Sequence, residues 1–235
     1  MLNIHFVLQG KGGVGKSFVS SLLSQYLLNK KQTVTAIDTD PNNTTLFNIK
    51  ALEAKFLQLI DNDGKFDVRQ FDKIVELVFE KKSTNYVVDS GATTFIPLID
   101  YLKENQAIEF LKSNKVEVYM HIPIVGGQAR EDTILGLTQL VSAFNCNFIV
   151  WVNEYHGAFN DFEDTEQYKA IKDKIKAIIY LNSLSKDTFG KDLLDLTSKN
   201  LTFDEALKDK TFSLMSKQRL TIFKDKAFKQ IEIIL

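Results

Sequence analysis

Short apolar runs alternate with helix-like segments along the chain. Six runs rich in β-branched and aromatic residues have the length and composition of buried strands, and they cover Ile4–Gln9, Thr33–Asp38, Tyr86–Asp89, Val116–Ile124, Phe148–Val152 and Ala177–Leu181. Between these runs, apolar residues recur at helical spacing in Phe18–Leu28, Asp72–Lys81 and Asp132–Phe144. Strands that alternate with helices form parallel βαβ units. The pattern predicts a three-layer α/β fold with a mostly parallel central sheet and helices on both of its faces.

The segment from Ala54 to Phe71 departs from this alternation. Strand-like stretches at residues 55–60 and 65–68 flank four turn-forming residues, 61–64. This arrangement predicts a β-hairpin at an edge of the sheet. Because the chain has three prolines, no internal repeat and no low-complexity linker, we expect a single domain over residues 1–235.

The C-terminal segment near 213–235 has the pattern of an amphipathic helix. One helical stripe is apolar and consists of Leu220, Phe223, Ala227, Ile231 and Ile234. Most of the basic residues lie elsewhere on the helix. We interpret it first as a last helix that covers the sheet. Peripheral contact with an anionic membrane, or docking on DNA or a protein partner, are the alternatives.

Composition narrows the classes of function. The 29 basic and 30 acidic residues give a formal net charge of −1, so any contact with nucleic acid or membrane must come from a local patch. The three arginines argue against a large sequence-specific DNA reader. Cys146 is the single cysteine, which rules out an internal disulfide, and no apolar run approaches the roughly 18 residues of a membrane span. These features are typical of a cytoplasmic protein.

The residues from Gly10 to Ser17 match the phosphate-binding pattern G-x-x-x-x-G-K-[ST]. The motif follows a strand-like run and opens an amphipathic helix, which is the context that the pattern requires. Its glycines allow the backbone amides to fold around phosphate oxygens, and the helix N-terminus adds a partial positive charge. Lys16 would reach the β- and γ-phosphates, and the Ser17 hydroxyl would coordinate Mg²⁺. The motif predicts a P-loop nucleoside triphosphatase fold.

Carboxylates follow two further strands. Asp38 and Asp40 stand at the end of one, and Asp89 stands at the end of another. The ligand site of an open α/β sheet lies outside the carboxyl ends of its strands, so these acids should converge on the phosphate loop. Each of them alone could instead cap a turn.

Together these residues resemble a known family. The segment from Lys11 to Ser17 is similar to the deviant Walker A box of the ParA and MinD class of P-loop ATPases, which carries an extra lysine at the place of Lys11. Residues 38–41 resemble the switch I motif of that class, and residues 89–91 resemble its Walker B and switch II motif. Within the class, residues 4–9 and 122–128 look most like the TraL group of conjugal transfer ATPases.

The resemblance implies a set of roles. Lys11 would reach the phosphates of the partner subunit in an ATP-sandwiched dimer, and Asp40 would position the attacking water. Ser17 would bind Mg²⁺ directly, whereas Asp38 and Asp89 would hold waters of the metal. Asn153 resembles the adenine-reading asparagine of the class, although a strand-end asparagine can equally be a cap. The implied catalytic residues are Lys11, Lys16 and Asp40, and the nucleotide-binding residues are Gly12, Gly13, Val14, Gly15, Lys16, Ser17, Phe18 and Asn153.

The chain also departs from its class. Asn42 replaces the glutamine that many partition ATPases have after the Asp-Pro pair, and residues 90–94 are not proline-rich. Coupling to a partition partner is therefore in doubt. The paired cysteines of nitrogenase-type iron proteins cannot be supplied by Cys146, so electron transfer is excluded.

Four hypotheses follow for the function. The first is an ATP-dependent dimerisation switch with slow hydrolysis that serves plasmid conjugal transfer or mobilisation and recruits a protein of the conjugation machinery. The second is a ParA-like partition ATPase that binds DNA non-specifically, and the third is a nucleotide-binding adaptor with negligible turnover. A small-molecule kinase or ligase is the fourth, with Gln128 and Arg130 as contacts to a second substrate.

Three further features are candidates of lower rank. We expect His121 to be a core or strand-edge histidine. His156 follows Asn153 closely and is expected to border the nucleotide or the dimer contact. The acidic residues from Asp161 to Glu166 are expected to open a helix, where the helix dipole favours carboxylates.

Overall fold

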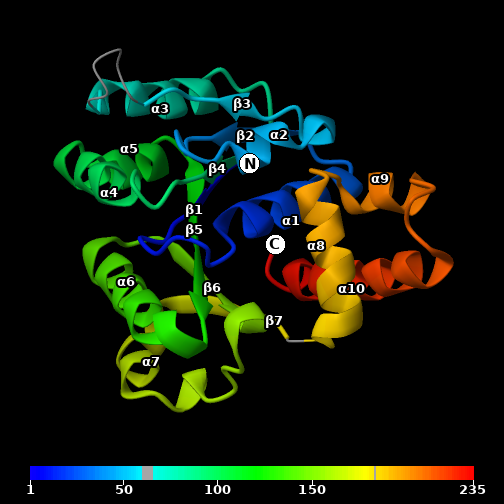
Figure 1. The fold of residues 1–235 in the computed structure, drawn as a ribbon. Coiled ribbons are helices and arrows are strands. Elements are labelled where there is room, and N and C mark those ends of the chain that lie inside the picture. The colour runs from blue at the N-terminus through cyan, green and yellow to red at the C-terminus, as the bar shows by residue number, and fades with distance from the viewer. Residues whose placement is uncertain (60–65, 183) are drawn as a thin grey trace.

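The computed structural model describes residues 1–59, 66–182 and 184–235 (Figure 1). Within these residues a sheet of 7 strands has the order β3-β2-β4-β1-β5-β6-β7, and every neighbouring pair is parallel. The strands are β1 Leu2–Val7, β2 Val34–Asp38, β3 Lys55–Phe56, β4 Asn85–Asp89, β5 Val116–Val125, β6 Asn147–Asn153 and β7 Ile175–Leu181. The predicted parallel α/β sheet is confirmed.

Helices cover both faces of the sheet, as the sequence predicts (Figure 1). One face packs against α3 Asp72–Phe79, α4 Phe95–Glu104, α5 Ala107–Ser113, α6 Arg130–Ala143 and α7 Glu166–Ile171. The other face packs against α1 Lys16–Asn29, α8 Lys191–Ser198, α9 Phe203–Lys208 and α10 Leu214–Glu232. The short α2, Thr45–Asn48, follows β2 and belongs to a third, smaller apolar cluster.

The two cores follow from strand geometry. Successive side chains of a strand point to opposite faces, so Phe6 of β1 enters one core and Val7 enters the other. In β6, Val150 and Trp151 divide in the same way. Both faces of the central strands are covered, and their sequences are apolar at nearly every position as a result.

The edge region around β3 differs from a simple hairpin. Lys55 and Phe56 pair with β2 at the edge of the sheet. The two expected arms meet where the backbone N–H of Asp67 donates to the carbonyl of Leu59, 3.0 Å away. The expected turn at residues 61–64 lies outside the described residues.

The C-terminal helix covers the sheet, which is the first of the interpretations that its pattern allowed. Its apolar stripe is buried in the same core as α1, and Leu220, Ala227 and Ile231 are at most 2% exposed. That stripe is therefore not free to enter a membrane. Among the described residues no helix is long and apolar enough to cross a bilayer.

A chain of polar side chains crosses the buried face of the sheet. The indole N–H of Trp151 donates to Nδ1 of His121 at 3.0 Å, so the remaining proton of a neutral His121 must lie on Nε2. That atom lies 3.0 Å from Nδ1 of His5, whose Nε2 in turn faces Oδ1 of Asn85 at 3.4 Å. Every donor therefore has an acceptor only when both imidazoles are neutral. His121 is a core histidine, as the sequence led us to expect.

The hydrogen-bonded row of side chains from Trp151 to Asn85 predicts that acid destabilises the fold. Burial lowers the pKa of His5 from 6.5 to about 4 and lowers the pKa of His121 as well. The unfolded chain therefore takes up protons before the folded protein does, and the histidines destabilise the fold as pH falls below 6.5 towards 4, by roughly 3 kcal/mol for His5.

The measurement is a ¹⁵N-detected NMR titration of the imidazoles together with urea unfolding at each pH. We expect both rings to remain neutral and protonated on Nε2 down to about pH 5. A proton on Nδ1 of His121 at neutral pH would contradict the proposed chain of donors.

Candidate nucleotide-binding site

The carboxyl ends of three neighbouring strands bring the expected site residues together. In the parallel register, Val7 of β1 lies opposite Asp89 of β4, and Asp89 lies opposite Asp38 of β2. The phosphate loop starts just beyond Val7 and ends where α1 begins at Lys16. The convergence that the sequence predicted is therefore a direct consequence of the strand register.

The backbone of the loop requires glycine at specific positions. Gly13 and Gly15 have φ angles of 74° and 97°, which is the left-handed region that side chains disfavour. A Cβ at Gly15 would lie 2.8 Å from Nδ2 of Asn153, and a Cβ at Gly10 would lie 2.9 Å from the ring of Phe95. Among the described residues no atom lies within 4 Å of a Cβ at Gly12, so the loop is open on that side.

Side chains hold three carbonyl groups of the loop. Nζ of Lys16 donates to the Lys11 carbonyl at 2.9 Å, Nδ2 of Asn153 donates to the Val14 carbonyl at 3.0 Å, and Nε2 of His156 lies 2.8 Å from the Gly13 carbonyl. These contacts fix the loop between α1 and the end of β6. The sequence left Asn153 open as an adenine-reading residue or a cap. In the structure its Oδ1 caps the next turn through the N–H of Tyr155, and its Nδ2 holds the loop at the wall of the adjacent cavity.

Lys16 is almost buried, with 7% of its surface exposed. Burial lowers the pKa of its ammonium group, while Asp89 and Asp40 act in the opposite direction. The loop thus presents a desolvated cation beside carboxylates, where a bound phosphate would replace the water that the ammonium group has lost.

Asp89 has an incomplete set of partners. Its Oδ1 accepts a hydrogen bond from the Ser20 hydroxyl at 2.9 Å, whereas its buried Oδ2 has no hydrogen-bond partner among the described residues. Burial raises the pKa of Asp89 to about 7, although the Ser17 hydroxyl acts to lower it. A buried carboxylate oxygen without a partner, close to a hydroxyl, fits a water-coordinated Mg²⁺.

Asp38 is the last residue of β2, and Asp40 lies in the loop that follows. The carboxylate of Asp38 accepts the backbone N–H groups of Asp40 and Phe47, both at 3.0 Å, while burial raises its pKa. Asp40 caps the next turn through the N–H of Asn42 at 2.9 Å. Its carboxylate also lies against Gly91, where a Cβ would come within 2.7 Å of Asp40 Cγ. Asp40 therefore contacts both switch-like segments.

Lys11 points away from the loop interior. Its Nζ forms an ion pair with Asp132 at the start of α6, at 2.7 Å, and the two side chains are 47% and 58% exposed. An exposed ion pair of this kind contributes little to stability and separates readily. The side chain of Lys11 therefore lies on the surface, although its backbone carbonyl contacts Lys16 within the loop.

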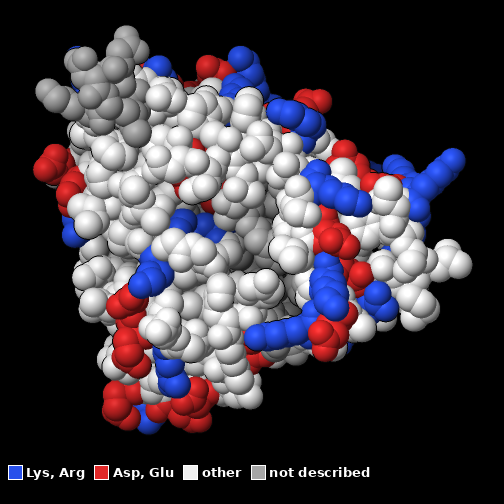
Figure 2. All heavy atoms as spheres, viewed as in Figure 1, with Lys and Arg blue, Asp and Glu red and all other residues white. Residues whose placement is uncertain are grey.

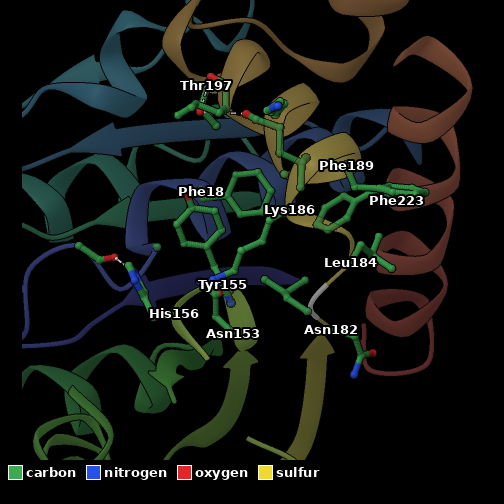
Figure 3. Close-up of a pocket in the computed structure, with 17 residues that line it drawn as sticks. Phe18, Asn153, Tyr155, His156, Asn182, Leu184, Lys186, Phe189, Thr197 and Phe223 are labelled. Carbon is green, nitrogen blue, oxygen red and sulfur yellow. Dashed lines mark hydrogen bonds between the residues drawn. The ribbon is translucent and has the colours of Figure 1, made fainter. Parts of the chain in front are cut away.

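A cavity of about 570 Å³ adjoins the phosphate loop (Figure 3). Gly13, Gly15, Phe18 and Asn153 line it from the side of the loop. Its other walls come from the segment after β6, the end of β7, and α8 with the turn before it, and they include Tyr155, Asn182, Lys186, Phe189 and Thr197. In the space-filling view, the surface is hollowed between the two groups of helices, and basic side chains lie at the hollow (Figure 2).

The sequence did not identify the distal wall of this cavity. Residues 181–182 and 184–197 carry no recognisable motif, and they reach the loop only because the fold places β7 and α8 there. No Asp or Glu is found among the described residues that line the cavity. A largely apolar pocket whose charged lining residues are lysines, beside a phosphate loop, suits the base and sugar of a nucleotide.

Arg130 and Glu166, which the sequence analysis also singled out, make contacts outside the phosphate loop and the cavity. The guanidinium group of Arg130 donates to Asp161 at 2.9 Å and lies 4.6 Å from the centre of the Phe159 ring. Glu166 opens α7 as expected, with Thr165 as its N-cap. Arg130 therefore has a structural explanation that needs no second substrate.

Comparisons with known proteins agree with this geometry. The model of the CobQ/CobB/MinD/ParA nucleotide binding domain matches residues 5–196. A protein from Escherichia coli named Protein TraL is 40% identical over 238 aligned positions, which cover 99% of this chain and 98% of TraL.

Solved structures share the fold at low sequence identity. MinD from Aquifex aeolicus is 19% identical, with a TM-score of 0.54 over 99% of this chain and 98% of its own. MinD from Pyrococcus horikoshii OT3, complexed with Mg-ADP, is 17% identical, with a TM-score of 0.51 over 100% of this chain and 99% of its own. The family model covers most of the chain, and TraL aligns with nearly its whole length at 40% identity. The chain therefore belongs to the CobQ/CobB/MinD/ParA family of nucleotide-binding domains.

Proposed function

We propose that this protein is an ATP- and Mg²⁺-dependent dimerisation switch that hydrolyses ATP slowly. The observation that carries the proposal is that Lys16 and Asp89 are both buried at the phosphate loop, where the charge of Asp89 acts on Lys16. Lys16 offers a desolvated cation for the phosphates, and Asp89 has an oxygen that a hydrated metal would satisfy. The cavity beside Phe18 and Asn153 would receive the adenosine.

The metal would be held in the manner that Mg²⁺ prefers. This small ion keeps several waters and takes few protein ligands in addition to phosphate oxygens. The Ser17 hydroxyl would bind it directly, and Asp38 and Asp89 would bind its waters. When bound, Mg²⁺ would neutralise charge on the β- and γ-phosphates. The Mg-ADP in the related MinD structure supports this choice of ligand.

Lys11 and Asp40 would complete the reaction. Lys11 would leave Asp132 and contact the phosphates of the partner subunit, where a cation stabilises charge that develops on the γ-phosphate. Asp40 would orient the attacking water in line with the γ-phosphate. Hydrolysis would then remove the group that holds the two subunits together.

We assign the switch to plasmid conjugal transfer or mobilisation. The support is the similarity to TraL over nearly the whole chain. In this assignment the ATP-bound dimer recruits a protein of the conjugation machinery, and the nucleotide state controls the recruitment.

The decisive experiment measures molar mass by light scattering with Mg-ADP and with Mg-ATP. Asp40→Ala is used to slow hydrolysis, and we expect a monomer with ADP and a dimer with ATP. Adding Lys11→Ala should return the ATP form to a monomer while ATP still binds, because Lys11 acts across the dimer. Asp132→Ala serves as a matched control that removes only the partner of Lys11 within the chain.

Three results would count against the proposal. A monomer with ATP, despite measured ATP binding, would favour the kinase or the adaptor hypothesis. A dimer that persists without Lys11 would exclude its role across the interface. Affinity for DNA that falls steeply with salt would favour the partition hypothesis instead.

A second prediction concerns the cost of the buried carboxylate. Because the folded protein raises the pKa of Asp89 to about 7, this group destabilises the fold increasingly as pH rises from about 4 to 7. Asp89→Asn should therefore be more stable than the wild type at pH 8, by roughly 2–4 kcal/mol, and the gain should vanish near pH 4. Hydrolysis should be lost in the same variant.

Urea unfolding at pH 5 and pH 8 tests this expectation, with Asp225→Asn on the exposed side of α10 as the control. Mg-ADP should stabilise the wild type more than Asp89→Asn, because ligand binding adds to the stability of the folded state. A variant that is less stable than the wild type at every pH would contradict this explanation.

A further inference from the structure

The turn that follows β6 brings two consecutive side chains to the site. Tyr155 and His156 both line the cavity, and His156 also reaches the phosphate loop (Figure 3). We propose that His156 is a positioning residue for the phosphate loop, which sets the affinity for the polyphosphate part of the nucleotide. This inference rests on the proposed function, because it assumes that the loop binds a nucleotide.

The hydrogen bond has a defined direction. Nε2 of His156 lies 2.8 Å from the carbonyl oxygen of Gly13, and a carbonyl oxygen can only accept. The imidazole therefore carries a proton on Nε2. Because the peptide bond is planar and trans, the N–H of Val14 points away from the Gly13 carbonyl that His156 holds. Holding that carbonyl thus fixes the direction of the Val14 amide, on the side opposite to His156.

Asn153 acts in the same way one residue further on. It holds the Val14 carbonyl at 3.0 Å, which aims the N–H of Gly15. The two side chains come from the same short segment, so adjacent amides of the loop are oriented by one rigid support. Amides that are oriented before a phosphate arrives bind it without paying for reorganisation.

The support itself is well fixed. The backbone N–H of Tyr155 donates to Oδ1 of Asn153 at 3.2 Å, and the N–H of Gly157 donates to the Glu154 carbonyl at 3.1 Å. On the other side, a Cβ at Gly127 would lie 2.9 Å from the His156 carbonyl, so the loop after β5 packs directly on the turn. His156 is therefore held in place by backbone contacts while its ring remains exposed.

The exposure of the His156 ring distinguishes a role in positioning the loop from a role in stabilising the fold. The His156 ring lies at the surface, where its aromatic neighbour is Tyr155, with the ring centres 5.1 Å apart. Loss of an exposed side chain of this kind changes stability little. Its loss should instead release the Gly13 carbonyl and leave the Val14 amide without a fixed direction.

The test compares His156→Leu, His156→Gln and Tyr155→Leu with the wild type. Affinity is measured by displacement of a fluorescent ADP analogue, in the presence of Mg²⁺, with ADP or inorganic pyrophosphate as the competitor. Pyrophosphate has no base or sugar, so it reports on the phosphate loop alone. The thermal midpoint of each variant is recorded to show that it is folded.

We expect His156→Leu to bind both competitors roughly three- to tenfold more weakly, which is the effect of losing one hydrogen bond. His156→Gln keeps an N–H donor and should recover most of this loss. Tyr155→Leu should weaken ADP and leave pyrophosphate unchanged. All three variants should melt at the temperature of the wild type.

The proposal is overturned if His156→Leu binds pyrophosphate as the wild type does. It is equally overturned if the Gln variant loses as much affinity as the Leu variant, because the donated hydrogen bond is then not the cause. An equal loss of pyrophosphate binding in Tyr155→Leu would assign the effect to the turn as a whole. A wild type that binds neither competitor would remove the proposed function, and this inference with it.

Discussion

The parallel register of β1, β4 and β2 is the constraint on which the site depends. It places Val7, Asp89 and Asp38 at the same level of the sheet, at the edge where the phosphate loop begins. Antiparallel neighbours would send alternate strand ends to opposite edges of the sheet. With all of these strand ends on one edge, a cation from α1 and two carboxylates meet without any long-range rearrangement of the chain.

Electrostatics at this edge work against the stability of the empty fold. Lys16 and Asp89 are both buried. Burial lowers the pKa of Lys16 and raises the pKa of Asp89, so it favours the neutral form of each group. One oxygen of Asp89 has no hydrogen-bond partner in the part of the chain that the structure describes. A site that is incomplete in this way gains most from a ligand that brings charge of both signs, and the Mg²⁺ complex of a nucleotide is such a ligand. The empty site thus lowers the stability of the fold at the residues that would bind the ligand.

The second face of the sheet forms the rest of the site. Arg219 of α10 donates to Asp192 of α8, with Nε 2.5 Å from Oδ2, and this pair lies largely buried. Phe18 of α1 packs near Phe223 of α10, with ring centres 5.9 Å apart. The C-terminal helix is therefore more than a cover for the core. It holds α8 in place and contributes to the cavity in which we propose that the adenosine binds.

Much of the fold and of the phosphate site could be predicted from the sequence. Apolar runs identified the strands, because the central strands are covered on both faces. The glycines around Lys16 identified the phosphate loop, because their spacing is typical of that motif. The strand from residue 4 was predicted to end at Gln9, but it ends at Val7. Leu8 and Gln9 are buried like strand residues, but Gln9 already bonds the β5 and α6 backbones through its side chain. Helix α4 was missed, because Pro97 in its first turn interrupts the helical pattern although a helix tolerates proline there.

Sequence alone determined the chemistry of the loop, since local spacing decides which atoms a short loop can present. It could not determine which distant segments close around that loop. Tyr155, Lys186 and Phe189 line the cavity because the sheet order brings β6, β7 and α8 beside α1. The contact of His156 with Gly13 joins residues 143 positions apart. Such pairings depend on the packing of whole elements, and only the tertiary structure decided them.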